Sequence, residues 1–340
     1  MKEKMPEIAI ILPAFNEEQT IGLTIEDFHS TLPEASIWVI NNRSTDATAT
    51  KAQAVLHQLG CKGGVLNEPR PGKGNAVRRG FTAVEADLYV LADADCTYPA
   101  KDLPKLLAPV LSGNADMVVG DRHAAGQYAT ENKRAFHGFG NRLVRDLVNR
   151  LFGAGLSDIL SGYRVFSRRF VKTYPVLVEG FEIETDVTLH ALDKRLSIVE
   201  IPVDYRDRPE GSASKLNTFR DGIRVLRTLV NILRHYRPLA FFGGMALLFL
   251  VLGLLLGAPV VEEFVRTRYI SHVPLAILST GVMVIAALLG SVGLILDSIV
   301  YLDRRVFERE LLRLGAVRSD RPDHSTQSGI ASGRANKNLT

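Results

Sequence analysis

The first 120 residues alternate between short apolar runs and amphipathic stretches. Strand-length apolar runs occur at 8–14 (IAIILPA), 36–41 (SIWVIN), 88–91 (LYVL) and 116–122 (DMVVGDR). Between these runs, apolar residues recur at helical spacing, as they do from residue 17 to about residue 32. The run at 88–91 is apolar on both faces, which is typical of a parallel strand between two helix layers. The pattern therefore predicts βαβ units, a mostly parallel sheet and an α/β fold.

After residue 130 the pattern becomes more helical and more basic. It predicts helices at about 130–152 and 183–194 and a strand at 198–208. From residue 216 to residue 236, apolar residues at helical spacing face arginines. This arrangement favours an amphipathic helix that lies in a membrane interface, with an ordinary domain-packing helix as the alternative.

Two uncharged apolar stretches follow, at 238–261 and 273–296. Each exceeds the ~20 residues that span a bilayer, so we expect two transmembrane helices, at 238–261 and 273–300. Arginines lie before the first stretch and after the second, whereas the charges of the short connector cancel. The positive-inside rule therefore predicts a multi-pass protein of the inner (cytoplasmic) membrane, with the connector outside and both termini in the cytoplasm.

These patterns divide the chain into four parts. We expect a cytoplasmic catalytic domain at 5–215, a juxtamembrane amphipathic helix at 216–237, two transmembrane helices within 238–302, and a basic segment with a disordered tail at 303–340. The formal net charge of +4 largely reflects the arginines that flank the apolar stretches. We therefore expect a membrane partner and no nucleic acid. Only two cysteines are present, which fits a reducing compartment.

Two carboxylates, Asp93 and Asp95, follow the strand-length run at 88–91. Side chains two apart on a strand share a face, so both can point beyond the carboxyl end of the strand, where open α/β sheets bind ligands. Hard oxygen donors at such a place suit Mg²⁺ or Mn²⁺ held against a diphosphate. Because a single Asp-x-Asp pair is a weak signal, its neighbours decide the interpretation.

This pair belongs to a set of seven ordered motifs: ILPAFNEE (11–18), NNRSTD (41–46), GKGNA (72–76), DAD (93–95), GDR (120–122), DILSGYR (158–164) and RDRPEGSASK (206–215). In their order and spacing, they resemble the family-2 inverting glycosyltransferases, specifically the polyprenyl-phosphate sugar transferases such as dolichol-phosphate mannose synthase. The resemblance covers about residues 5–240. It implies a nucleotide-binding domain of the GT-A type, which the two apolar stretches would anchor.

The resemblance also implies roles for individual residues on the donor side. The candidate residues for binding the nucleotide-diphosphate sugar are Pro13, Ala14, Asn16, Glu17, Asn41, Lys73 and Asp93. Lys73 offers a positive charge to a phosphate, and Asp93 and Asp95 are the candidate metal ligands. Relatives usually have two acids where this chain has Asn41 and Asn42, which leaves the nucleotide open. A second departure is Thr97, where some relatives offer a further metal ligand.

The acceptor side needs cations beside the membrane. Arg122 in the GDR motif matches the arginine that holds the lipid phosphate in relatives. The further candidates for this phosphate are Lys133, Arg134, Arg208 and Lys215, with an ambiguous register around Lys133–His137. Arg164 is either a structural residue or a phosphate contact. Asp93, Asp95 and Arg122 are thus the candidate catalytic residues.

The reaction that these residues imply is transfer of one sugar, with inversion, from a nucleotide-diphosphate sugar to a polyprenyl phosphate. A UDP-linked hexose or N-acetylhexosamine is preferred over GDP-mannose as the donor. One alternative is a processive polysaccharide synthase, but Trp38 is the only tryptophan, so the Q-x-x-R-W type motif of those enzymes is absent. A catalytically weak adaptor in a glycan-assembly complex is a second alternative. Glycines in both apolar stretches are compatible with a homo-oligomer.

Overall fold

The computed structural model describes residues 5–123, 135–206 and 218–319 of the chain. Its strands are β1 (Ile8–Ala14), β2 (Ser36–Asn41), β3 (Gly63–Asn67), β4 (Leu88–Leu91), β5 (Met117–Asp121), β6 (Arg164–Ser167) and β7 (Ile198–Pro202). Its helices are α1 (Ile21–Thr31), α2 (Thr48–Gln58), α3 (Lys73–Ala83), η1 (Ala100–Asp102), α4 (Leu103–Leu111), α6 (Ala135–Phe152), α7 (Arg168–Thr173), α8 (Ile183–Asp193), α9 (Thr218–Tyr236), α10 (Pro238–Thr267) and α11 (Val273–Ser319).

The strands form one sheet in the order β3-β2-β1-β4-β6-β5-β7. Only β6 runs antiparallel to its neighbours, β4 and β5, and the other pairs are parallel. This confirms the predicted α/β fold with a mostly parallel sheet. Because β4 and β5 run in the same direction on either side of β6, their carboxyl ends reach the same edge of the sheet. The carboxyl ends of β1 and β2 also lie there.

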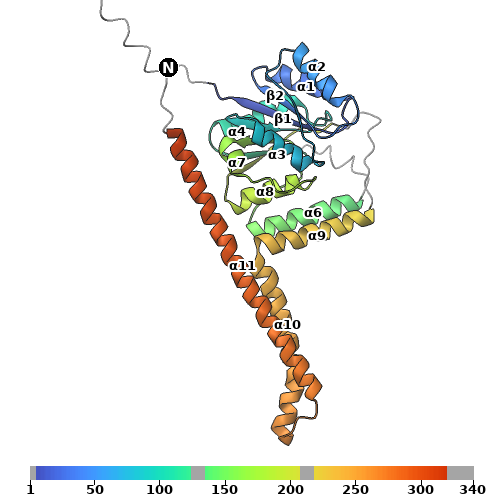
Figure 1. Ribbon diagram of the computed structural model, residues 1–340, viewed down its shortest axis with the longest axis vertical. Helices are drawn as coiled ribbons and strands as arrows, with labels where there is room; N and C mark the ends of the chain where they lie inside the picture. Colours follow the sequence, from blue (N-terminus) through green and yellow to red (C-terminus); the bar gives the residue numbers. More distant parts are fainter. Residues whose placement is uncertain (1–4, 124–134, 207–217, 320–340) are drawn as a thin grey trace, which may run out of the picture.

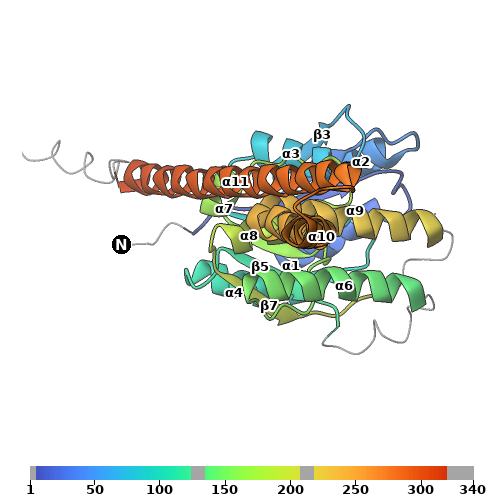
Figure 2. The ribbon, with the colours of Figure 1, turned by 90° about the horizontal axis from the view of Figure 1, so that it is seen from below.

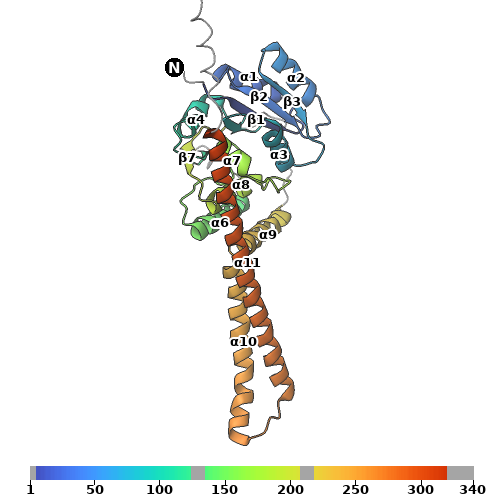
Figure 3. The same ribbon diagram turned by 60° about the vertical axis from the view of Figure 1, so that its left-hand side comes forward.

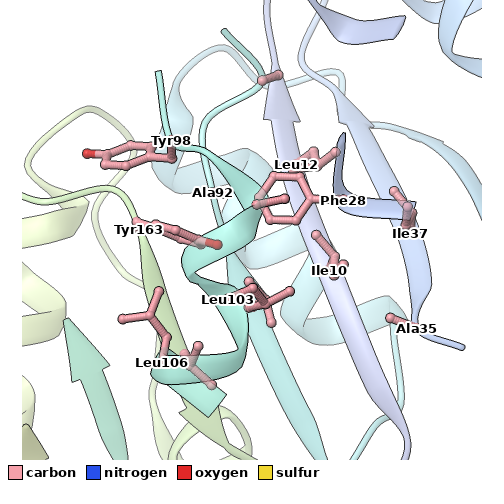
Figure 4. Close-up of a cluster of buried hydrophobic side chains, with 14 of the residues drawn as sticks. Ile10, Leu12, Phe28, Ala35, Ile37, Ala92, Tyr98, Leu103, Leu106 and Tyr163 are labelled. Carbon is pink, nitrogen blue, oxygen red and sulfur yellow. The ribbon is translucent and has the colours of Figure 1, made fainter. Parts of the chain in front are cut away.

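Alternate residues of the central strands supply two hydrophobic cores, one on each face of the sheet. Ile10 and Leu12 of β1 face the core under α1, α2 and α4, which Figure 4 shows with Phe28 and Leu103 packed beside them. Ala9 and Ile11 face the opposite core, under α3, α7 and α8. Because both faces are covered by helices, the strands are apolar throughout, as the sequence indicated.

A further helical layer lies beyond α8. Figure 1 shows α6 and α9 side by side between the sheet domain and the two long helices. Val148 of α6, Leu189 of α8 and Ile232 of α9 share one buried cluster. The described side chains of α9 thus include some that pack against the domain, which is the alternative role considered for this helix. Its predicted place in a membrane interface stays a prediction.

The last two helices form a long antiparallel hairpin that extends away from the domain (Figures 1 and 3). Both are long and apolar enough to cross a membrane, and only 6% and 11% of their most apolar windows are buried within the protein. Glycines bring the two helices together. A Cβ atom at Gly253 would lie 2.6 Å from Met283, and one at Gly257 would lie 2.7 Å from Ser279. These glycines therefore serve packing within the hairpin.

Helix α11 continues well past the predicted end of the second span at residue 300. Its 47 residues correspond to about 70 Å of helix, more than twice the hydrocarbon thickness of a bilayer. Its later half runs back beside the domain, as Figure 2 shows from below. Phe307, which is 7% exposed, joins the core under α7 and α8. The part of the basic segment from residue 303 to residue 319 is therefore helical.

One other element boundary differs from the pattern-based prediction. Strand β7 ends at Pro202, opposite Asp121, the last residue of β5, so it is shorter than the predicted 198–208. The ladder ends where its partner ends and where proline offers no N–H group.

Candidate active site

Most of the predicted site residues within the described ranges lie at the carboxyl edge of the sheet. Pro13 and Ala14 end β1 and pair with Ile40 and Asn41 of β2. Asp93 and Asp95 follow β4, and Arg122 follows β5. Lys73 reaches this group from the first residue of α3. The topology thus brings together residues that are spread over more than 100 positions of the chain.

The loops that follow β1 and β2 are fastened to each other by hydrogen bonds. Asn16 has a left-handed backbone (φ 55°), and its Oδ1 atom accepts a hydrogen bond of 2.8 Å from the Thr45 N–H group. The N–H group of Glu17 donates to Thr48 Oγ1 at 2.8 Å. Side-chain oxygens here satisfy backbone donors that would otherwise face solvent. These contacts hold the candidate nucleoside loop in one conformation.

The two asparagines that replace acids have different surroundings. Asn41 donates from Nδ2 to Asn67 Oδ1 at 2.9 Å and accepts from the Ser44 N–H group at 3.2 Å. Asn42 is buried, and its Oδ1 accepts from the Gly72 N–H group at 2.8 Å. Asn42 therefore holds the loop before α3, whereas Asn41 and Asn67 together present amide groups at the edge of the sheet.

Asp95 is the more enclosed of the two paired carboxylates, with 4% of the residue exposed. Its Oδ1 atom accepts hydrogen bonds from Thr97 Oγ1 at 2.6 Å and from the Thr97 N–H group at 3.2 Å. A short acceptor–hydroxyl contact of this kind fixes the rotamer of the carboxylate. Thr97 thus orients Asp95, in the place where some relatives were expected to offer a metal ligand.

Asp93 belongs to a three-membered ion cluster. The Lys73 ammonium contacts Asp93 Oδ1 and lies 2.5 Å from Glu184 Oε1. Burial opposes the charged form of Lys73, but Asp93 and Glu184 outweigh it, so the pKa of Lys73 lies above its ordinary value. The side chains of Lys73 and Glu184 are 10% and 8% exposed, whereas that of Asp93 is 27% exposed. Asp93 is therefore the member of the cluster that a ligand can approach.

The glycines on both sides of Lys73 make room for the protein's own backbone. A Cβ atom at Gly72 would lie 2.1 Å from the carbonyl oxygen of Glu179, and one at Gly74 would lie 2.1 Å from that of Val178. The Gly74 N–H group donates to the Glu179 carbonyl at 2.9 Å. The GKG glycines thus allow this part of the chain to approach the segment that leads into α8, the helix that carries Glu184.

Arg122 is held by Asp158, a residue of the DILSGYR motif. Its Nε and Nη2 atoms donate to the two carboxylate oxygens at 2.7 and 2.9 Å. Burial raises the pKa of Asp158, but the hydrogen bonds and charge of Arg122 have a larger effect in the opposite direction, so the pKa lies below its ordinary value. The guanidinium also lies 5.5 Å from the ring centroid of Tyr205. Arg122 is therefore fixed in place.

The loop that carries Asp158 is held in place by hydrogen bonds to Glu200 of β7. Both carboxylate oxygens of Glu200 accept from the Ser157 N–H group, at 2.8 and 3.0 Å, and one accepts from the Asp158 N–H group at 2.9 Å. Arg164 is fully buried and donates to the Ile159 carbonyl at 2.9 Å. Arg164 is thus a structural residue. The candidates Lys133, Arg134, Arg208 and Lys215 lie outside the described residues.

The Asp93–Asp95 pair has the chemistry of a magnesium or manganese site completed by a substrate. Among residues 5–123, 135–206 and 218–319, no group of three or more His, Cys, Asp or Glu side chains is arranged to hold a metal ion. Mg²⁺, however, is usually held by only one or two carboxylates together with substrate phosphates. A pair that offers two carboxylates, one of them partly exposed, fits that requirement.

Sequence reasoning did not assign roles to Glu184, Asp158 or Glu200. Asp158 lies within a motif that resembles the family, but its partner Arg122 is 36 residues away. Glu184 is an acid in a helix whose neighbours Ile183 and Val187 are buried, and this is the only local signal of its role. A buried acid in a helix calls for a partner, but the sequence does not indicate which one.

The sequence and the fold both match known glycosyltransferases. The family model described as "Glycosyl transferase family 2" matches residues 9–174. Glycosyltransferase AglJ of Haloferax volcanii is 31% identical over 304 residues, which are 89% of this chain and 96% of that protein. The dolichyl-phosphate hexose transferase of the same organism is 26% identical, over 66% of this chain and 93% of that protein.

A solved structure supports the fold assignment. Glucosyl-3-phosphoglycerate synthase of Mycobacterium tuberculosis, in complex with Mn²⁺, UDP and glucosyl-3-phosphoglycerate, superposes with a TM-score of 0.52 and 23% sequence identity. The match covers 67% of this chain and 79% of that chain. At this identity it shows the fold alone. With its match to the family model, its full-length relative and its sheet order, the chain belongs to glycosyl transferase family 2.

Proposed function

We propose that this glycosyltransferase moves a single sugar from a nucleotide-diphosphate sugar to a polyprenyl phosphate, with inversion, at the cytoplasmic face of a membrane. The observation that carries the proposal is the placement of Asp93, Asp95 and Arg122 at one edge of the sheet, in a domain joined to two apolar helices. An acidic pair suits a metal-bound diphosphate, and an oriented arginine suits a phosphate. The similarity to a dolichyl-phosphate hexose transferase supports the same acceptor class.

On the donor side, Asp93 and Asp95 would hold Mg²⁺ or Mn²⁺ against the diphosphate. A bound divalent cation would stabilise the negative charge that develops on the leaving diphosphate. The fastened loops after β1 and β2 would hold the nucleoside. The amides of Asn41 and Asn67 offer donors and acceptors to a base, and a uracil has both a carbonyl and an N–H group to match them. A UDP-sugar fits this arrangement and is the donor class that we propose.

On the acceptor side, the nucleophile would be an oxygen of the lipid phosphate. The second pKa of a phosphate monoester is ~6, so at neutral pH this oxygen is largely anionic and needs no general base. It would attack the anomeric carbon opposite the diphosphate. One C–O bond forms while the other breaks, and its electron pair leaves with the nucleoside diphosphate. Arg122, oriented by Asp158, would place the attacking phosphate.

The hairpin would anchor the domain where the lipid phosphate lies. The domain sits at the end of the hairpin where α10 begins and α11 leaves the apolar region (Figure 1). The flanking arginines, such as Arg237 and Arg304, lie at this end. By the positive-inside rule this end would be cytoplasmic. Lys133, Arg134, Arg208 and Lys215 stay candidate contacts of the lipid phosphate.

The test is sugar transfer by the purified full-length protein. It would be incubated with undecaprenyl phosphate, Mg²⁺ or Mn²⁺ and a panel of labelled UDP- and GDP-sugars, and lipid would then be extracted. We expect label in the organic phase with one donor, and loss of that label when the metal is chelated. The anomeric configuration of the product would report inversion. Lipid and metal binding without transfer from any donor would contradict the proposal.

A further inference from the structure

The ion cluster beside the candidate metal pair is unequal in charge. Lys73 is its one cation, and Asp93 and Glu184 are its two anions. Asp95 adds a further carboxylate to the site. If all four groups are ionised, as the paired lysine favours, their sum is −2. This sum matches the charge of one divalent cation.

Glu184 determines whether the charge of Asp93 is available to a bound cation. Without it, the buried Lys73 ammonium would have Asp93 as its one remaining partner in the cluster. The pair would then be neutral, and a cation approaching Asp93 would face the lysine charge at short range. Charges interact strongly in such partly buried sites, because water screens them poorly. A second anion in contact with the ammonium, Glu184, offsets this charge and reduces the competition.

Contacts of the neighbouring backbone hold Glu184 beside Lys73. The segment before α8 packs against the start of α3, where the Gly74 N–H group donates to the Glu179 carbonyl at 2.9 Å. One turn after Glu184, Thr188 Oγ1 donates to the Glu184 carbonyl at 2.9 Å and is buried beside Arg164. The ends of α3 and α8 that carry the lysine and the glutamate are therefore fixed against each other.

We propose that Glu184 is a positioning residue. Its charge offsets that of Lys73, so the negative charge of Asp93 is available to a divalent cation at the Asp93–Asp95 pair. This inference rests on the proposed function only for the identity of the site as the metal site of sugar transfer. It is a statement about charge balance. It therefore predicts that the order of metal affinities among variants follows their net charge.

The experiment measures Mn²⁺ binding directly, from the loss of the free-ion signal in electron paramagnetic resonance, with the full-length protein and no sugar donor. Glu184→Gln keeps the side-chain shape and reduces the net negative charge from −2 to −1, so we expect affinity to fall by about tenfold. Adding Lys73→Met to this variant returns the sum to −2, so we expect affinity to return close to that of the wild type. Lys73→Met alone should bind Mn²⁺ at least as tightly as the wild type.

Glu182→Gln is the matched control, because Glu182 is exposed two residues earlier and contacts neither Lys73 nor Asp93 in the structure. We expect it to bind Mn²⁺ like the wild type. Thermal unfolding of each variant would identify any that has lost its fold. Unchanged Mn²⁺ affinity in a folded Glu184→Gln protein would overturn the inference. So would a double variant that binds no better than Glu184→Gln, or a wild type that binds no Mn²⁺ at millimolar concentrations.

Sugar transfer measured on the same preparations separates this inference from the proposed function. If the charge order holds but no donor is used, the proposed reaction fails and the role of Glu184 at a metal site stands. If transfer is found but Mn²⁺ affinity ignores the charge of residues 73 and 184, the reaction stands and the role of Glu184 fails.

Discussion

The two ends of helix α8 carry ion clusters of opposite design. At the first turn, Glu184 and Asp93 share the single cation Lys73. At the last turn, Asp193 and Lys194 meet Asp303 and Arg304 of α11. The Arg304 Nη2 atom lies 2.5 Å from Asp193 Oδ1, and Lys194 contacts both acids. The first cluster has an excess of negative charge, and the second is balanced.

This difference separates a ligand site from a structural joint. A balanced cluster satisfies itself, and here it fastens the later half of α11 to the domain. An unbalanced buried cluster is costly unless something else completes it. The candidate metal and diphosphate would do so at Asp93. Charge imbalance therefore indicates the ligand site, even though both clusters combine acidic and basic side chains at an end of the same helix.

The largest effect is expected from removing Asp95, which belongs to the unbalanced end. Asp95→Ala should lower sugar transfer by about 10³-fold or more, because the charge stabilisation of a bound metal is worth several kcal/mol. Label in extracted lipid would measure it. Asp146→Ala is the control, since Asp146 is 63% exposed on α6. Normal turnover of Asp95→Ala with metal removed would refute the assignment of the site.

The Arg122–Asp158 ion pair, which is balanced in charge, tests whether such a pair can also bind a ligand. Arg122→Ala should mainly raise the KM for the lipid, by about 10²-fold, because a charge-assisted phosphate contact is lost. It should also destabilise the protein by about 3 kcal/mol, because Asp158 stays buried without its partner. Steady-state kinetics against lipid concentration, with thermal unfolding alongside, would measure both effects.

Asp158→Asn is the comparison for that prediction. It leaves the Arg122 cation present but less well oriented, so the lipid KM should rise by less than in Arg122→Ala. An equal rise in both variants would mean that Arg122 acts only as the structural partner of Asp158. The Arg122–Asp158 pair would then have a structural role, like the balanced cluster at the last turn of α8.

The placement of the candidate donor residues at one edge of the sheet could be predicted from sequence because these residues follow strands directly. Asp93, Asp95 and Asn41 each lie at or just after the end of an apolar run, and parallel strands bring such ends to one edge. The alternation of apolar runs and helical stretches similarly predicted the sheet and its two helix layers. In both cases local sequence and a general packing rule were sufficient.

The partners of these residues could not be predicted in the same way. Lys73 meets Glu184 across 111 positions, and Lys194 meets Asp303 across 109. Such contacts depend on how α3, α8 and α11 pack, which no local pattern records. The surroundings of the GKG glycines could not be predicted for the same reason. They contact the segment before α8, whose position only the tertiary structure reveals.

Phe307 tests the joint at the balanced end of α8. Its ring packs against His190, with centroids 5.5 Å apart, and lies under the Lys194 ammonium at 5.6 Å. Phe307→Ala should destabilise the docked α11 by about 3 kcal/mol, through lost burial and the cavity left behind. Thermal unfolding in detergent would measure this. Leu312→Ala, at a position 75% exposed on the same helix, should have little effect, and equal losses in both variants would contradict the docking role.

His190 gives the smallest effect and the most direct test of charge balance at this end. Its Nε2 atom is buried with no hydrogen-bond partner in the structure. Burial and the charge of Lys194 lower the pKa of His190, Asp193 and Asp303 act in the opposite direction, and the resulting pKa is about 4. A proton on His190 would add a positive charge near Lys194 and so disturb the charge balance of this cluster.

The sign of the pH effect follows from that shift. Between the ordinary pKa of ~6.5 and the native pKa of about 4, the unfolded chain binds a proton that the native protein does not. Stability should therefore fall as the pH drops through this range, by about 2 kcal/mol at pH 5. His190→Leu should remove this part of the pH dependence, whereas His57→Gln on the exposed side of α2 should leave it nearly intact. Identical pH profiles for His190→Leu and the wild type would mean that the joint tolerates the added charge.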